Sequence, residues 1–495
     1  MHALAFVPFA AAVLLSAAPA LAQGAAPDLG EAKDLLGERT EQQVQQGAAI
    51  CVKANNVAAV ELLLDVIAQT ERRTNLHLAP AHYRDIVWDA LQRITDPYAR
   101  RRVEHELKTG RDPNVRQWCA ELLGIYGEKG FGETLRAALR ASDDDLVRWA
   151  VRSLGMLKFE PAIQQLDALA KHKNDYVRAN AIEALAQIDT GHVGALLTAI
   201  AQDKSGGVRC ALLGAAPALC GDALEGICST ALTDPDWRPR MQAVENLGKI
   251  RTKTAVDALI RALQDGRPVV AARALRELQE LTGQPIQQPD VWAKWWADNR
   301  ETFGFPDKRG VPQRSVGTVV YNGVPVDSDH VAFLLDKSIM MRAQLTSKGS
   351  TKEEAAYAEF ERVLQKLDDK ITFNVFNYDV EISAFAKKAT KLTAKVRKKA
   401  LEFAATKCEG REKDIWQAVS TVLDDPTLDT AYLLSSGEPD TGLYVHWNRV
   451  TRHLADLNRF HKVTVHAVAY TDSDWFRDQL KKIAEVTGGS FEQLQ

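Results

Sequence analysis

A spacing of 31 residues recurs through the first half of the chain without an insertion or a deletion. The positions that keep this spacing are mostly apolar. One series consists of Leu123, Leu154, Leu185, Ala216, Leu247 and Leu278, and another of Cys119, Ala150, Ala181, Leu212, Ala243 and Ala274. A fixed period of this length is typical of helical repeat arrays. Because one helical pair cannot cover its own apolar face, neighbouring repeats are expected to stack into an elongated solenoid.

A polar series with the same spacing marks where the first helix of each repeat should begin. Its members are Asp112, Asp143, Asn174, Ser205 and Asp236, each a few residues before an apolar run. Their short side chains can accept hydrogen bonds from the free N–H groups of a first helical turn. Each repeat is therefore predicted to be a capped helix, a turn and a second helix, and the array offers a long surface to partners.

The chain has 495 residues, which is too long for one compact core. Terminal repeats need a polar outer face, so they are expected to drift from the internal pattern. The predicted divisions are a helical cap or degenerate repeat at 23–80, regular repeats at 81–285, a Trp-rich cap and linker at 286–314, and a second domain at 315–495.

Three tryptophans follow the last regular repeat. Trp292, Trp295 and Trp296 stand at positions i, i+3 and i+4, so they share one face of a helix. The open end of a solenoid has to be covered, and we interpret these indoles as its closing cap. A ligand site lined by aromatic rings is the alternative.

The N-terminus has the features of a secretory signal peptide. An apolar run from Ala3 to Leu15 precedes small residues and Ala20-Leu21-Ala22, which predicts a signal peptide over residues 1–22 with cleavage after Ala22. We therefore expect a periplasmic or secreted protein. No later stretch approaches the roughly 18–20 consecutive apolar residues that span a bilayer, so we predict that the mature chain is not transmembrane.

The charge of the chain limits the classes of partner. The formal net charge is -3 with 26% charged residues, so no overall field attracts nucleic acid. One basic run contains no acid, and its cations are Lys387, Lys388, Lys391, Lys395, Arg397, Lys398 and Lys399. Such a run is usually a solvated helix face. Docking of this run to an anionic envelope polymer or lipid surface is the alternative.

Six cysteines are distributed along the chain without the CxxC spacing that is typical of zinc sites. Cys228 falls in a leucine position of the repeat, so we expect it in the core. Cys220 falls in a turn position and is the best candidate for an exposed thiol. An oxidising compartment would allow a disulfide between these two residues, and the spacing does not decide whether it forms.

Three repeats share a motif that identifies a family. Their matching triplets are Asp112, Val115 and Arg116; Asn174, Val177 and Arg178; and Ser205, Val208 and Arg209. These resemble HEAT repeats of the short bacterial type. The resemblance implies a helical solenoid, and that family includes both interaction scaffolds and chromophore lyases.

Beyond residue 315 the pattern changes to alternating strands and helices. Apolar runs predict strands at Val331–Leu335, Ile371–Phe376, Thr430–Leu434 and Val463–Val468, and helices at 353–367, 391–407, 412–424, 444–460 and 474–486. This alternation predicts a mostly parallel sheet with helices on both faces. In such sheets ligands bind at the carboxyl ends of the strands.

Two of these strand ends resemble the von Willebrand factor A domain. They are Asp336-Lys337-Ser338 and the turn from Ser435 to Pro439, and the segment from Ile483 to Phe491 is similar to the last helix and strand of that family. The resemblance implies a doubly wound, Rossmann-like α/β fold. It also implies a metal-ion-dependent adhesion site built from an Asp-x-Ser-x-Ser turn, a threonine and a later aspartate.

That metal site is degenerate in this chain. Asp336 and Ser338 match the first two ligands, whereas Met340, Lys413 and Ser436 replace a serine, a threonine and a carboxylate. Mg²⁺ prefers hard oxygen ligands and carboxylate charge, which a thioether and an ammonium group do not supply. We predict no tight metal binding and no cofactor, with weak Mg²⁺ or Ca²⁺ binding at most.

Two interpretations of Lys413 remain open. Its ammonium group would take the place of the metal and pair with Asp336, which otherwise is a poorly compensated carboxylate. Alternatively, Lys413 points to water, and backbone N–H groups and Ser338 satisfy Asp336.

No HExxH, GxSxG, P-loop or GxGxxG motif is present in the sequence, so we predict that the protein is not an enzyme. The sequence as a whole predicts a multi-domain protein: an all-α HEAT-like solenoid followed by an α/β domain of the von Willebrand factor A type. The expected function is an exported interaction scaffold that binds protein partners through the solenoid and the loops of the second domain. The alternatives are a metal-dependent adhesion protein and a lyase-like enzyme of the HEAT-repeat class.

Overall fold

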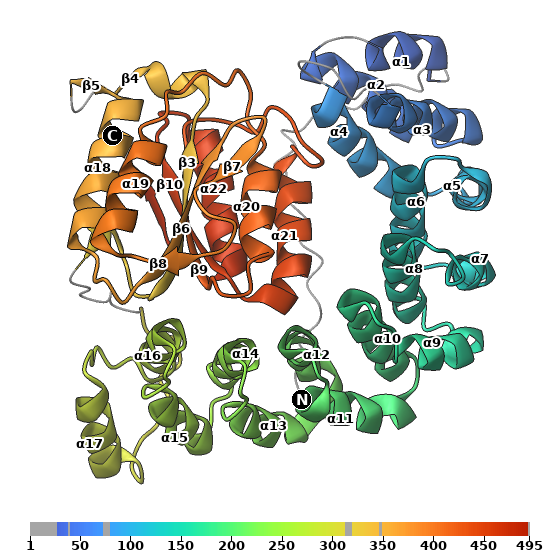
Figure 1. The fold of residues 1–495 in the computed structure, drawn as a ribbon. Coiled ribbons are helices and arrows are strands. Elements are labelled where there is room, and N and C mark those ends of the chain that lie inside the picture. Colours follow the sequence, from blue (N-terminus) through green and yellow to red (C-terminus); the bar gives the residue numbers. More distant parts are fainter. Residues whose placement is uncertain (1–26, 38–39, 73–79, 312–318, 346–348, 494–495) are drawn as a thin grey trace.

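The computed structural model describes residues 27–37, 40–72, 80–311, 319–345 and 349–493. The expected signal peptide lies outside these ranges. Within them the chain forms a helical solenoid and then an α/β domain, as predicted, and the solenoid curves around the second domain (Figure 1).

The solenoid is built from paired helices in two layers. Helices α6, α8, α10, α12, α14 and α16 pack one after another to form the inner layer (Figure 1). The helices are α1 (Leu29–Leu36), α2 (Glu41–Ala54), α3 (Val57–Arg72), α4 (Pro80–Gln92), α5 (Pro97–Thr109), α6 (Pro113–Tyr126), α7 (Gly132–Ala138), α8 (Asp144–Met156), α9 (Ile163–Leu169), α10 (Asp175–Ile188), α11 (Val193–Gln202), α12 (Gly206–Leu219), α13 (Leu224–Ala231), α14 (Trp237–Leu247), α15 (Lys253–Ala262), α16 (Pro268–Thr282) and α17 (Pro289–Asn299).

The two periodic series of the sequence have the predicted roles. The leucine series is buried in the solenoid core. The polar series supplies the N-caps of α6, α8, α10, α12 and α14, and each of its side chains accepts a backbone N–H from the first helical turn. In the next repeat the same position holds Arg267, which caps nothing with its side chain.

Paired arginines and aspartates link successive repeats. Three bidentate pairs recur every 31 residues, namely Arg178 with Asp203, Arg209 with Asp234 and Arg240 with Asp265. Each pair joins an inner helix to the loop that leads into the next repeat. Because bidentate Arg–carboxylate contacts fix geometry as well as adding energy, they hold the repeats in register.

The tryptophan-rich helix α17 packs against α15 at the end of the solenoid. Trp292 and Trp296 are buried, and their indole N–H groups donate to the Ile286 carbonyl at 3.0 Å and to the Asp257 carboxylate at 2.6 Å. The rings fill the end of the core and their polar atoms are satisfied, which is the packing expected of a cap.

The α/β domain contains a twisted sheet with helices on both faces. The strand order is β11-β10-β9-β3-β6-β7, with β8 also paired to β6. Strands β3, β6, β9, β10 and β11 run parallel, while β7 and β8 form an antiparallel edge. The strands are β1 (Val320–Tyr321), β2 (Val324–Pro325), β3 (His330–Asp336), β4 (Gln344–Leu345), β5 (Ser350–Thr351), β6 (Thr372–Tyr378), β7 (Ile382–Ala384), β8 (Thr390–Lys391), β9 (Thr430–Ser435), β10 (Thr464–Ala469) and β11 (Phe491–Gln493).

Alternate residues of each strand face different helices. Phe333 of β3 packs in the cluster of α18 and α19, whereas Leu334 belongs to the cluster of α20, α21 and α22. These helices are α18 (Lys352–Lys366), α19 (Ala394–Ala404), α20 (Ile415–Leu423), α21 (Trp447–His461) and α22 (Asp474–Thr487). The helices and strands predicted here are all present, with ends that differ by a few residues.

All six cysteines lie within the described residues and are free thiols. Cys220 is half-buried and the other five are buried, so the disulfide between Cys220 and Cys228 that the sequence left open is not formed. Across the described ranges, no helix has both the length and the apolar character needed to cross a bilayer.

Candidate functional site

The carboxyl end of β3 places Asp336 against two loops. One carboxylate oxygen of Asp336 accepts the backbone N–H of Ser338 at 2.8 Å, and the other accepts the N–H of Ser436 at 2.9 Å and its hydroxyl at 2.7 Å. Asp336, Ser338 and Ser436 are all buried. The structure therefore brings together three of the five residues of the predicted degenerate site, and protein donors already use both oxygens of the carboxylate.

Within the described ranges, the other two residues of the predicted site form no hydrogen bond or ion pair with these three. Met340 is half exposed on the short turn Ile339–Arg342. Lys413 is only 1% exposed, and its ammonium group lies 3.5 Å from the carboxylate of Asp440. Within the described ranges the ion pair of Lys413 is with Asp440, so the pair expected with Asp336 is not found.

Neither interpretation of Lys413 is correct in full. The side chain does not point to water, because the turn after β9 covers it and the backbone N–H of Asp440 donates to the Lys413 carbonyl at 3.0 Å. Asp336 is satisfied by backbone N–H groups, as the second interpretation expected, but the hydroxyl that it accepts belongs to Ser436.

Two further lysines are buried near this edge. The ammonium group of Lys337 donates to the carbonyl of Ala404 at 2.7 Å, and burial lowers its pKa. Burial also lowers the pKa of Lys352 at the start of α18, and the neighbouring charge of Lys413 adds to this effect. The edge thus already holds several partly desolvated cations, which oppose the entry of a divalent cation.

The predicted basic run lies on the antiparallel edge and on α19. Its six lysines are exposed. Arg397 is the exception, since it pairs with Asp369 at 2.8 Å and donates to the Leu367 carbonyl. This is the arrangement of a solvated face, and docking to an anionic surface stays a prediction.

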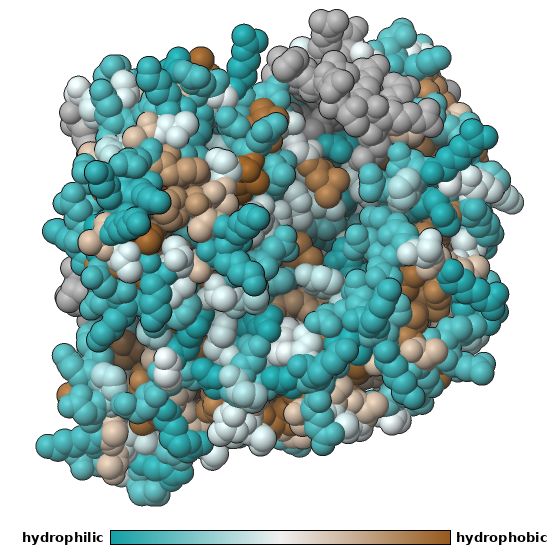
Figure 2. Space-filling view, in the orientation of Figure 1, coloured by the Kyte–Doolittle hydropathy of each residue, from teal (hydrophilic) through white to brown (hydrophobic). Residues whose placement is uncertain are grey.

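A second candidate site was not predicted and lies between the two domains. Helix α21 runs along the inner layer of the solenoid and packs directly against α12 (Figure 1). At Gly207 of α12, a Cβ atom would lie 3.1 Å from the Phe460 carbonyl oxygen. In the space-filling view, side chains fill much of the space between solenoid and sheet (Figure 2). We call the surface that the inner-layer helices of the solenoid present to α21 the inner groove.

Ion pairs connect α21 to the same position in four of the repeats. Arg452 pairs with Glu121 at 2.5 Å, and Lys462 pairs with Glu245 at 2.6 Å. Between them, Asp456 pairs with Arg152, and Arg459 pairs with Glu183. The solenoid partners belong to a single series with the 31-residue spacing: Glu121, Arg152, Glu183, Gly214, Glu245 and Arg276.

This charged series could have indicated the contact with α21 from the sequence, but we did not recognise it. Each member directly follows a residue of a mostly buried series, so it lies at the edge of the core face of each inner helix; that buried series is Ala120, Val151, Ile182, Leu213, Val244 and Leu275. Charges of alternating sign at such a position are unusual in a repeat that only has to stack on its neighbours, because stacking requires apolar contact. A repeating charged position therefore indicates a bound partner along the groove.

Arg449 forms the centre of the contact near the first repeats. Its guanidinium lies 4.3 Å from the ring centre of Trp88, 4.5 Å from that of Trp118 and 5.1 Å from that of Tyr444. It is 1% exposed and pairs with Asp85 at 3.4 Å and with Glu121 at 3.5 Å. Cation–π contacts of this kind gain strength where water is excluded.

Asp85 also binds the backbone of the segment that precedes α21. Its carboxylate accepts the backbone N–H groups of Val445 and His446, which precede the first turn of the helix. Burial raises the pKa of Asp85 to about 6, although Arg449 and His446 oppose that shift. A carboxylate of the solenoid thus acts at the positive end of a helix from the other domain.

Arg267 anchors the opposite end of the interface. Its guanidinium donates to the Asp429 carboxylate at 2.6 Å and to the Thr427 carbonyl at 2.7 Å. Asp429 lies within 4.8 Å of Asp329 and His330 in a grouping that could hold a metal. However, Asp429 already accepts from Arg267 and from two hydroxyls, so this contact is a joint between the domains.

Comparison with protein families matches part of the solenoid. The family described as HEAT repeats matches residues 132–216 and 224–299. No curated protein sequence matches the chain at a significant level.

Solved structures similar to this chain are of low identity. The complex of CpcE and CpcF of phycocyanin lyase from Nostoc sp. PCC7120 is 17% identical over 53% of this chain and 98% of its own, with a TM-score of 0.29. A von Willebrand factor type A protein from Catenulispora acidiphila is 15% identical over 33% of this chain and 38% of its own, with a TM-score of 0.28. A homology model of the full-length AP-3 complex is 14% identical over 54% of each chain, with a TM-score of 0.34. The match spans less than two thirds of the length of the last two structures. The chain thus contains HEAT repeats, followed by an α/β domain whose parallel sheet is consistent with the von Willebrand factor A type.

Proposed function

We propose that this protein is an exported, non-catalytic scaffold in which the solenoid holds the α/β domain and the loops of that domain bind a protein partner. One observation supports this most directly: α21 of the same chain occupies the inner groove, through ion pairs at four repeats. The concave side of a solenoid is its usual binding surface. With that side filled, an external partner has to bind elsewhere.

The distribution of exposed apolar side chains supports the loops as the partner surface. Six large hydrophobic side chains of the described α/β domain are exposed, and five follow the carboxyl ends of parallel strands: Ile339, Met340, Val380, Leu443 and Trp475. The sixth, Val486, lies on α22. Because the carboxyl ends of parallel strands meet at one edge, these residues belong to one end of the domain. We call this end the sheet edge.

Tryptophan is enriched among the residues that dominate binding energy at protein interfaces. Trp475 is 52% exposed at the start of α22, and Leu443 is 40% exposed in the loop after β9. We therefore propose contact through shape and apolar burial. Tight binding through a metal is not part of this proposal, because Asp336 is already saturated by protein donors.

Affinity purification from the native envelope tests this function. The full-length chain should retain a partner that the double variant Trp475→Asp, Leu443→Asp releases. Val291→Asp is the matched control, since Val291 is 43% exposed on α17 at the far end of the solenoid. Equal recovery of every protein by the double variant and by wild type would contradict the proposal. Sequencing of the mature N-terminus, expected at Gln23, tests export.

A further inference from the structure

An open pocket of about 360 Å³ lies where the last repeats meet the α/β domain. Its walls come from the loop after α14, from α16 and from the linker on one side, and from the Gly488–Gly489 turn before β11 on the other. This volume lies within the range of small-ligand sites, which is about 300–1,000 Å³. We call it the seam pocket, and its charged lining residues are Lys249, Arg273, Arg276, Arg309, Glu277 and Glu280.

The cations of the seam pocket outnumber its carboxylates. Arg309 pairs with both Glu277 and Glu280, at 2.9 Å each. Arg273 also pairs with Glu277, at 2.9 Å. The two lining carboxylates are therefore already compensated. Among the residues that the structure describes, neither Arg276 nor Lys249 forms an ion pair.

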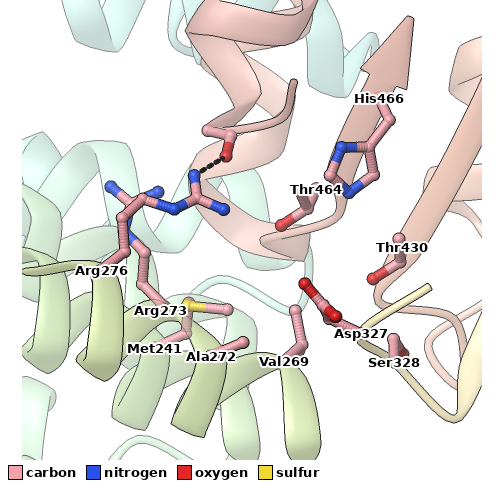
Figure 3. Close-up of a pocket in the computed structure, with 11 residues that line it drawn as sticks. Met241, Val269, Ala272, Arg273, Arg276, Asp327, Ser328, Thr430, Thr464 and His466 are labelled. Carbon is pink, nitrogen blue, oxygen red and sulfur yellow. Dashed lines mark hydrogen bonds between the residues drawn. The ribbon is translucent and has the colours of Figure 1, made fainter. Parts of the chain in front are cut away.

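The two arginines of α16 are held close together by the turn. Arg276 donates to the Gly488 carbonyl at 2.8 Å, as the dashed line in Figure 3 marks. A Cβ atom at Gly488 would lie 2.4 Å from a guanidinium nitrogen of Arg273, so only glycine lets that side chain lie against the turn. Burial and the neighbouring Arg273 lower the pKa of Arg276. Arg273 is compensated by Glu245 and Glu277, whereas Arg276 forms no ion pair in the described structure and is the guanidinium that an anion would compensate.

A second cavity adjoins the seam pocket and is too small for the same ligand. Its volume is about 30 Å³, and Asp327, Thr430 and His466 line it together with the two arginines (Figure 3). Such a volume accommodates no more than two or three water molecules. The anion therefore has to enter from the open side, where Lys249 is exposed.

We propose that the seam pocket binds a small phosphate-type oxyanion, held by Arg276 and Lys249 with Arg273 beside them. The planar fork of arginine matches phosphate oxygens with two parallel hydrogen bonds, and lysine adds a point charge. Because Arg276 also contacts the Gly488 turn, the bound anion joins the end of the solenoid to the α/β domain. Because the anion binds where the two domains meet, its binding stabilises the docked arrangement of the solenoid and the α/β domain by mass action.

The experiment uses the full-length chain with inorganic phosphate and pyrophosphate as probes and malonate as a dicarboxylate comparison. Ionic strength is held constant with chloride, and binding is followed by calorimetry and by the thermal midpoint. We expect saturable pyrophosphate binding with a Kd below about 1 mM and a midpoint that rises with ligand concentration. Arg276→Gln should raise the Kd at least about tenfold, and Lys249→Gln at least about threefold.

Lys294→Gln is the matched control, because Lys294 is exposed on α17 at the same end of the solenoid and lies outside the pocket. Its Kd should equal that of wild type. The exposed ammonium group of Lys249 forms no hydrogen bond or ion pair within the described ranges, so Lys249→Gln tests the site with little effect on the fold. A non-saturating rise of the midpoint that is equal in all variants would be a general salt effect and would overturn the proposal. Malonate binding as tight as that of pyrophosphate would overturn the assignment to phosphate.

Discussion

The inner groove and the sheet edge are both places where domains of these architectures bind partners, but they carry different chemistry. The groove presents charges at a fixed spacing to a helix of the same chain. The sheet edge presents exposed apolar side chains on loops and a carboxylate that protein donors already saturate. The inner groove is therefore an internal contact in which paired charges fix the register, whereas the sheet edge is still available to other molecules.

The largest effect is expected from Arg449→Ala, which removes a fully buried cation from the groove contact. The change removes three ring contacts and leaves Asp85 and Glu121 buried without their shared cation. We expect the free energy of unfolding to fall by about 3–5 kcal/mol, measured by urea denaturation. Arg452→Ala is the control, since that side chain is 36% exposed and should cost less. A loss below about 1 kcal/mol for Arg449→Ala would show that the groove contact is superficial.

The raised pKa of Asp85 makes the stability of the groove contact depend on pH. In the unfolded chain this carboxyl ionises near 3.8, whereas in the folded protein it does so at about 6. Between these values the folded state retains a proton that the unfolded state has lost, so stability decreases as pH rises. Relative to Asp85→Asn, wild type should lose about 2 kcal/mol between pH 4 and pH 6.5. Urea unfolding of both proteins across this range measures the difference, and a pH-independent difference would disprove the assignment.

The ion pairs between the inner groove and α21 can be tested by exchanging charges. Glu183→Arg and Arg459→Glu should each destabilise the protein, and the double variant should recover about 1–2 kcal/mol of the combined loss. Both side chains are partly exposed, so solvent screening keeps this value moderate. A double-mutant cycle by thermal unfolding supplies the coupling energy. If the two losses simply add, the register of α21 does not depend on this pair.

The smallest effect is expected at the sheet edge when divalent cations are added. Both oxygens of Asp336 accept protein hydrogen bonds, and Lys413 is buried nearby. We therefore expect no binding of Mg²⁺ or Mn²⁺ with micromolar affinity. Isothermal titration calorimetry is the measurement. Micromolar affinity that Asp336→Ala abolishes would instead favour the metal-dependent adhesion alternative.

Local patterns made much of the fold predictable. The 31-residue period and the five N-cap positions depend on contacts within one repeat and its neighbour, so sequence spacing is sufficient to locate them. The strands of the α/β domain were predictable because each is a short apolar run between helical segments.

The candidate sites were less predictable because they depend on residues that are distant in the sequence. Asp336 meets Ser436 across 100 residues, and Lys413 takes Asp440 as its partner because the turn after β9 folds over it. Helix α21 begins at Trp447, later than the predicted start at residue 444. The N–H groups of Val445 and His446 that precede it are bound by Asp85, about 360 residues away. Spacing alone does not reveal contacts of this kind.

The docking of α21 in the inner groove is tested most directly by zero-length carbodiimide crosslinking with mass spectrometry. The ammonium group of Lys462 lies 2.6 Å from the Glu245 carboxylate, so the two should be joined by an amide bond. In Lys462→Arg the charge pair persists but the amide cannot form, and the crosslink should disappear. Crosslinks from Lys462 to other carboxylates, with Glu245 unmodified, would contradict the account.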